Sequence, residues 1–178
     1  MQWWGYVIIA GVIFILAVLV LIWIIVASNR LVVLKKNVDR NFPLINTKIK
    51  EYNKTVDDVL AELRKKIKTK NAAIDGVKKA NKNLAIAEGI FNKIEKQRDV
   101  EKKVDVFSKT LNKQEELKGD KKVKNLLKDI RKIQDEINFI TQKYNNAVQE
   151  YNETIARFPT RLVAERFKFE QAKKWNKE

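Results

Sequence analysis

The first pattern along the chain is an unbroken apolar run near its N-terminus. Residues 3–27 carry no charged side chain. Because an α-helix rises about 1.5 Å per residue, this run reaches about 37 Å, enough to cross a hydrocarbon core of about 30 Å with some tilt. We therefore expect residues 1–28 to form a transmembrane anchor and residues 29–178 to form a domain outside the bilayer.

A cleaved signal peptide is the alternative interpretation of the same run. Such a peptide needs a basic N-terminal region, an apolar stretch of about 7–15 residues and a small-residue cleavage site. Met1 and Gln2 supply no basic region, the apolar run is longer, and Ala27-Ser28 is a poor cleavage site. An uncleaved anchor is therefore the favoured interpretation.

Aromatic and basic residues mark the ends of the run. Trp3, Trp4 and Tyr6 lie at one end and Trp23 lies near the other, as in the aromatic belts found at headgroup depth. No Lys or Arg precedes the run, whereas Arg30 is the first of four basic residues that follow it closely. The positive-inside rule then predicts a single-pass protein of the inner, cytoplasmic membrane, with its N-terminus outside and its C-terminal domain in the cytoplasm.

Beyond the run, hydrophobic residues recur at steps of three and four, the spacing of helices that bury one face. One stripe covers residues 31–67 and another covers residues 123–158. Since no Gly or Pro separates the apolar run from Pro43, we expect the anchor helix to continue directly into the first stripe. Pro43 itself removes a helical hydrogen bond, so we predict a kink or break near residues 41–42.

The segments between and after the stripes are less regular. Residues 71–118 keep a weaker helical spacing interrupted by Gly76 and Gly89, so we predict one broken helix or two shorter ones. Gly119 suits the end of a helix and Asp120 suits the N-cap of the next one.

Pro159 should end or kink the second long helix, and residues 161–175 form a short amphipathic tail. Neither long stripe can bury its apolar face alone. The predicted fold is therefore all-α: a single N-terminal transmembrane helix followed by an elongated antiparallel bundle of three long helices, with the last segment as a fourth. The same spacing permits coiled-coil pairing between subunits.

The composition speaks against several kinds of chemistry. The chain has no Cys and no His, and so lacks disulfides, thiol chemistry, the commonest general base and the commonest metal ligand. It also shows no Gly-rich phosphate loop and no metal-ligand cluster. We therefore expect no enzymatic activity, no cofactor and no metal.

The net charge of +15 would attract anionic lipid or nucleic acid. A genome rich in A and T, whose codons favour Lys and Asn, explains the same excess equally well, and the charge is spread over the whole domain. Aromatics that stack on RNA lie on exposed sheets or loops, whereas those of this chain follow helical stripes. Nucleic acid is therefore not expected as a partner.

The most specific motif is YNNAVQEYNETIARFP in residues 144–159, in which a Tyr-Asn pair recurs after seven residues. We interpret it as alternating layers of a bundle core, with the Asn side chains flanking the seam and hydrogen-bonding across it. A contact with a ligand is the other interpretation. The fixed positions of the motif are Tyr144, Asn145, Val148, Tyr151, Asn152, Ile155, Phe158 and Pro159.

This repeat resembles the LemA family of bacterial membrane proteins, whose pattern is Y-N-x-x-V-x-x-Y-N-x-x-I-x-x-F-P. Residues 29–42 and 162–169 are also similar to family segments. Three positions depart from the usual pattern, with Gln134, Thr141 and Lys168 in place of the common Glu, Arg and Gly. The resemblance implies one N-terminal anchor, a long helical domain and no assigned catalytic activity.

Three functions fit these features. The first is a membrane-anchored scaffolding protein that forms a homo-oligomer through its helical rod. The second is an accessory subunit that presents the rod to another membrane protein, such as a protease. The third is a basic module that binds anionic lipid. Subunit packing predicts apolar side chains left over outside the intramolecular seam, and the candidates are Phe42, Leu44, Phe139, Phe167 and Trp175.

Overall fold

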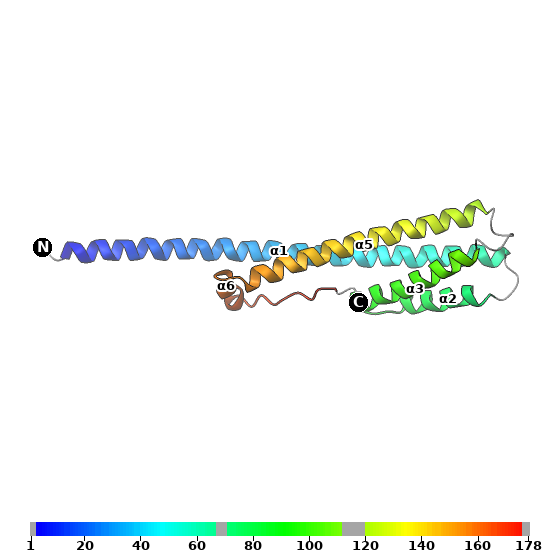
Figure 1. Cartoon of the computed structure of the whole chain (residues 1–178). Coiled ribbons are helices and arrows are strands. Elements are labelled where there is room, and N and C mark those ends of the chain that lie inside the picture. Colours follow the sequence, from blue (N-terminus) through cyan, green and yellow to red (C-terminus); the bar gives the residue numbers. More distant parts are fainter. Residues whose placement is uncertain (1–2, 67–70, 112–119, 176–178) are drawn as a thin grey trace. The chain divides into compact units, whose positions relative to one another are not determined.

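The computed structural model describes residues 3–66, 71–111 and 120–175, and every regular element in these ranges is helical. The all-α prediction is therefore confirmed. The helices of these ranges are labelled in Figure 1: α1 (Trp3–Lys66), α2 (Ala72–Ala85), α3 (Ile90–Leu111), α5 (Lys121–Ala156) and α6 (Thr160–Arg166).

Helix α1 joins the apolar run to the first stripe without interruption, as predicted. Of the predicted kink or break near residues 41–42, the break is wrong, because α1 remains helical through Pro43, whereas the kink stays a prediction. Proline removes one hydrogen bond from the helix. Val38 and Ile45 on either side of it are buried, so tertiary packing holds both flanking turns in helical conformation.

The chain divides into two compact units. The first unit contains the described residues 3–39 and 144–175, and the second contains the described residues between 40 and 143. Both long helices thus contribute one half to each unit.

The second unit packs four helical segments together: the C-terminal half of α1, α2, α3 and the N-terminal half of α5. Between α1 and α5, Lys48 Nζ lies 2.6 Å from Glu136 Oε2, and Lys122 Nζ lies 2.9 Å from Glu62 Oε2. Between α1 and α3, Lys93 Nζ donates to Asn46 Oδ1 at 2.9 Å. These polar contacts lie beside the buried apolar stripes and tie the segments to one another.

The predicted interruptions have clear local causes. The region 71–111 forms two helices, and Gly89 lies between them with φ +74°, in the left-handed region that glycine adopts readily. Asn71 caps α2 by accepting a hydrogen bond from the amide of Ala73. Asp120 caps α5 in the predicted way, accepting from the amides of Lys122 and Val123. Gly119 lies outside the described residues.

The first unit combines the N-terminal half of α1, the C-terminal half of α5, α6 and the segment after it. The predicted fourth helix is present but shorter than the segment 161–175. Helix α6 ends at Arg166, and residues 169–175 form a non-helical segment that runs back along α5 (Figure 1). This segment is where the Tyr-Asn repeat makes its contacts.

Candidate functional site

The two asparagines of the repeat bind the main chain of the C-terminal segment. Asn152 donates from Nδ2 to the carbonyl oxygen of Ala172 at 2.8 Å and accepts the Ala172 amide at Oδ1 at 2.9 Å. Asn145 makes the same pair of hydrogen bonds with Trp175, at 2.8 and 2.9 Å. Each side-chain amide therefore satisfies both backbone polar groups of one residue.

The two tyrosines of the repeat add a second set of contacts to the same segment. Tyr151 donates its hydroxyl hydrogen to the carbonyl oxygen of Glu170 at 3.0 Å, and Tyr144 donates to that of Lys173 at 2.8 Å. Burial, followed by the negative charge of Asp39, raises the pKa of both phenols above the ordinary value. The hydroxyls therefore remain protonated donors over the physiological pH range.

The seven-residue period of the motif matches a three-residue period in the bound segment. Tyr151 and Tyr144 bind residues 170 and 173, and Asn152 and Asn145 bind residues 172 and 175. Seven residues of α-helix advance about 10.5 Å, and three residues of extended chain advance about 10 Å. The two repeats are in register because these lengths agree, with the segment running antiparallel to α5.

Most of these contacts reach the main chain of the segment, so they depend little on its side chains. Trp175 is the exception, because its side chain is buried at the end of this series of hydrogen bonds. The hydrogen bond from Lys174 Nζ to Gln149 Oε1 is exposed. We call this set of hydrogen bonds between the Tyr-Asn repeat and residues 170–175 the latch, because it fixes the segment against α5. The sequence predicted that the asparagines flank the seam and form hydrogen bonds. It did not predict their partners, because the period of a helix does not show which other segment of the chain lies near it.

The remaining motif residues divide between core and surface. Tyr144, Val148, Tyr151 and Ile155 are buried, whereas Phe158 is 76% exposed and Pro159 is also exposed. Placing Phe158 and Pro159 in the core seam was therefore wrong. Helix α5 ends at Ala156, so the side chains beyond it no longer follow the helical period. Gln134 and Thr141, which precede the repeat and depart from the usual family pattern, are both buried.

The N-terminal half of α1 presents the residues predicted to anchor the chain. Trp3, Trp4, Tyr6 and Arg30 are exposed, and Trp23 is partly buried. The rings of Trp3 and Trp4 lie 4.6 Å apart. By length and composition, α1 is apolar enough to cross a membrane, and its most hydrophobic window has no buried residue. The N-terminal part of α1 is therefore a candidate membrane anchor.

A buried polar cluster in the second unit was not anticipated. Asn81 is 1% exposed, donates to the carbonyl of Asn53 and to Asp57 Oδ1, and accepts from Asn53 Nδ2. The signal was present in the sequence, because Asn81 follows Val77 by four residues and precedes Leu84 by three. A fully satisfied polar group of this kind fixes the register of α2 on α1.

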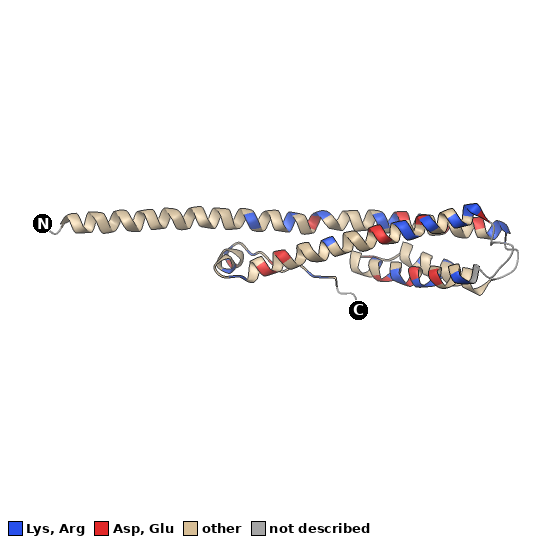
Figure 2. Ribbon diagram, turned by 45° about the horizontal axis from the view of Figure 1, so that its top comes forward, with Lys and Arg blue, Asp and Glu red and all other residues tan. Residues whose placement is uncertain are grey.

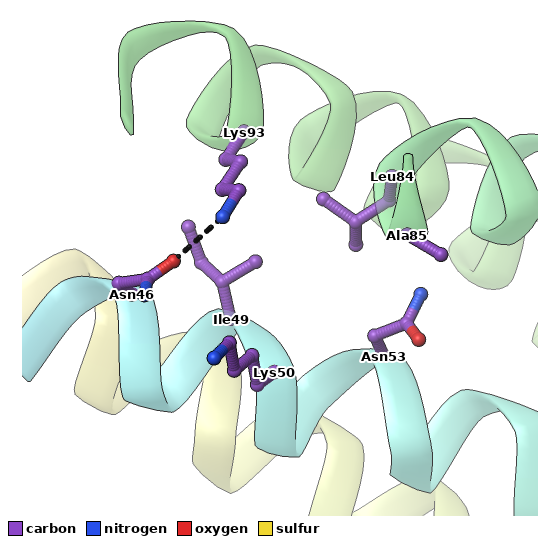
Figure 3. Close-up of a pocket in the computed structure, with 7 residues that line it drawn as sticks. All are labelled: Asn46, Ile49, Lys50, Asn53, Leu84, Ala85 and Lys93. Carbon is purple, nitrogen blue, oxygen red and sulfur yellow. Dashed lines mark hydrogen bonds between the residues drawn. The ribbon is translucent and has the colours of Figure 1, made fainter. Parts of the chain in front are cut away.

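A small cavity of about 200 Å³ lies beside this cluster, between α1 and the α2–α3 pair (Figure 3). Ile49 and Leu84 form its apolar wall, and Lys93 reaches across to Asn46. Within the described ranges, no three His, Cys, Asp or Glu side chains come together in a way that could hold a metal ion. Apart from the apolar wall and that hydrogen bond, the cavity is lined by Lys50, Asn53 and Ala85.

Charged side chains of both signs are interspersed along the polar parts of the helices (Figure 2). The apolar N-terminal part of α1 carries none, so the charged side chains begin where the apolar run ends.

The comparison with protein families agrees with the repeat. A model of the LemA family matches residues 32–178, which is more than half of the chain. The curated proteins compared with the chain gave no match.

Proposed function

Because the chain belongs to the LemA family, we propose that it is a non-catalytic, membrane-anchored structural protein that self-assembles through its helical domain. The observation that carries the proposal is the apolar half of α1, whose large side chains are exposed from Trp3 to Ile22. An exposed apolar surface of this length is stable only in a bilayer or under another apolar surface. We place it in the cytoplasmic membrane with the domain on the cytoplasmic side, as the charge step after residue 28 favours.

Apolar side chains outside the anchor support self-assembly. Leu44 is 49% exposed and Phe139 is 57% exposed, and both are too large to be left in water without cost. Lys143 Nζ lies 4.4 Å from the centre of the Phe139 ring and covers only part of it. Two other candidates have intramolecular partners: Phe42 packs edge-on against Phe91, and Trp175 closes the latch.

The anchor itself offers room for a second helix. A Cβ atom added at Gly5 or Gly11 would meet no atom within 4 Å, and small residues let transmembrane helices approach closely. Confinement to the membrane plane raises the effective concentration, so weak contacts along the domain would suffice.

Cysteine crosslinking in the native membrane tests self-assembly, because the chain contains no Cys. Gln149→Cys and Lys54→Cys place the thiol on exposed positions, and Val148→Cys is the matched control, since Val148 is fully buried. With two copies carrying tags of different size, we expect mixed dimers from the exposed positions and none from Val148→Cys.

Monomers alone at every exposed position, at native expression level, would contradict self-assembly. Crosslinks only to a different protein would favour the second function, an accessory subunit that presents its helical domain to another membrane protein.

A further inference from the structure

The turn after α5 contains both buried and exposed apolar side chains. We call residues 157–168 the cap; they include α6. Val163 and Ala164 are buried, whereas Phe158, Leu162 and Phe167 are 76%, 56% and 55% exposed. The cap therefore buries two smaller apolar side chains and leaves three large ones exposed.

The cap lies at the level where the apolar run of α1 ends. Along α1, Ile22 is still exposed, Trp23 is partly buried, and Ala27 and Leu31 are buried. Figures 1 and 2 both show α6 beside this N-terminal half of α1. The covered part of α1 therefore begins within about one turn of the end of its membrane-spanning length.

The pairing of α1 with α5 gives the same placement. The first unit contains α1 up to Asp39 and α5 from Tyr144 onward, so both helices enter this unit at these two residues. From Tyr144, α5 continues to Ala156 and then into the cap. From Asp39, α1 followed toward its N-terminus reaches Ala27. Each of these two helical stretches is about three turns long, so the cap and the end of the apolar run lie at a similar distance from the points where the two helices enter the unit.

The exposed charges around the cap are mostly positive. Arg157, Arg161, Arg166 and Lys168 are exposed, and Arg161 pairs with Glu165 at 2.7 Å. Basic side chains that flank an apolar group at this depth face the phosphates of anionic lipids.

We propose that the cap is a second membrane contact, with Phe158, Leu162 and Phe167 inserted at the boundary between headgroups and acyl chains. The leaflet is the one from which α1 emerges, and the arginines of the cap face its lipid phosphates. This inference rests on the proposed anchoring of α1. We choose the bilayer as the occupant because the cap lies beside the N-terminal half of α1, which carries the apolar run, and because its exposed charges are mostly positive, as anionic lipid requires. Attachment at α1 and at the cap fixes the angle at which the first unit stands on the membrane.

Depth-dependent quenching in the full-length protein tests the contact. Single cysteines are introduced at Leu162, at Val12 in the apolar run and at Asn146, an exposed residue of α5 away from the cap. Each variant is labelled with a fluorophore and reconstituted in vesicles of phosphatidylcholine with a minority of phosphatidylglycerol. Quenchers are doxyl groups at shallow and deep acyl positions and an aqueous ion. We expect shallow doxyl lipid to quench the label at Leu162 several-fold more than that at Asn146, and the aqueous ion to show the reverse order.

The label at Val12 separates failure of this contact from failure of the anchor. Strong quenching of Val12 by deep doxyl lipid, together with equal behaviour of Leu162 and Asn146, would overturn the cap contact and leave the anchor in place. Shielding of Leu162 from both quenchers would mean that a second protein surface covers the cap, and would also overturn it. A label at Val12 that only the aqueous ion quenches would overturn the anchor and the cap contact together.

Discussion

At the scale of single residues, the latch depends on the chemistry of the carboxamide. Asn carries a donor and an acceptor side by side, and each of Asn145 and Asn152 uses both on the main chain of one residue. An Asp at either position would keep the acceptor but set a carboxylate oxygen against a carbonyl oxygen. A Leu would leave a half-buried amide and carbonyl without partners, which costs more than the hydrogen bonds themselves contribute.

Asn152→Ala should loosen the latch at one position. It removes two hydrogen bonds worth about 1 kcal/mol each, so the amide of Ala172 should exchange with solvent roughly 30-fold faster. The measurement is hydrogen exchange of the full-length protein in detergent, read at residues 170–175. Asn146→Ala is the control, because Asn146 is exposed and is not one of the residues that bind the C-terminal segment. Unchanged exchange at Ala172 in Asn152→Ala would show that the segment is not held by this side chain.

At the scale of helices, two glycines of the α2–α3 region have opposite roles, because one lies inside a helix and the other lies in the turn between the two helices. Gly76 is inside α2 and Gly89 precedes α3 with φ +74°. Gly76→Ala should stabilise the second unit by up to about 1 kcal/mol, because Ala loses less backbone freedom in a helix and its Cβ meets no neighbour. Gly89→Ala should destabilise it by about 1–2 kcal/mol, because L-residues disfavour positive φ.

Thermal unfolding of the full-length protein in detergent, followed by helical circular dichroism, compares the two variants. A melting temperature that moves in the same direction for both would contradict the roles assigned to these glycines.

The pairing of α1 with α5 should weaken in acid. The ammonium of Lys122, helped by Lys65, holds the pKa of Glu62 below its ordinary value of 4.5. A carboxyl group with a lowered pKa in the folded state stabilises the fold above its ordinary pKa, and this contribution is lost as the pH falls through the lower folded value. Below about pH 4.5, the melting temperature of the unchanged protein should therefore fall faster than that of Glu62→Gln.

Glu62→Gln keeps the size of the side chain and removes its titration. Lys48 lowers the pKa of Glu136 in the same way, so Glu136→Gln should also flatten the fall of the melting temperature in acid. Identical acid profiles for Glu62→Gln and the unchanged protein would contradict the contribution of this ion pair.

Helices were predictable where a periodic stripe continued over many turns. The stripes predicted in α1 and α5 are buried at nearly every position, since the three-to-four spacing alone decides which side of a helix is apolar. Pro43 was misread because local propensity favours a break, whereas packing on both sides of residue 43 outweighs one lost hydrogen bond. Residues 161–175 were misread because their apolar residues suit a helix, although the main chain of residues 170–175 finds partners on α5.

At the scale of the whole molecule, the sequence did not show that each long helix serves two units. A continuous stripe carries no mark at the point where its neighbours change, so the boundary near residues 39 and 144 has no sequence signal. The apolar side chains of the cap were similarly ambiguous. Phe158 continues the spacing of the stripe, and only the end of α5 at Ala156 turns it to the outside.

The orientation of the protein in the membrane would depend on basic residues both after the apolar run and in the cap. During insertion, the basic residues that count lie close to the apolar run in sequence, and Arg30 is the first of them. The basic residues of the cap are far away in sequence and do not count at that stage. In the proposed placement they lie beside the end of the run once the domain has folded, and an anionic cytoplasmic leaflet would attract them. Both stages therefore favour the same orientation.

We accordingly expect protease added to intact, wall-stripped cells to leave residues 31–178 undigested, and protease added to permeabilised cells to degrade them. A known cytoplasmic protein in the same cells serves as the control for intactness. Substitution of Arg30, Lys35, Lys36 and Arg40 by Gln should reduce the protected fraction, because it removes the charge step that orients the anchor. Digestion of the unchanged domain in intact cells would show that the orientation is reversed, and the cap would then face the outer leaflet.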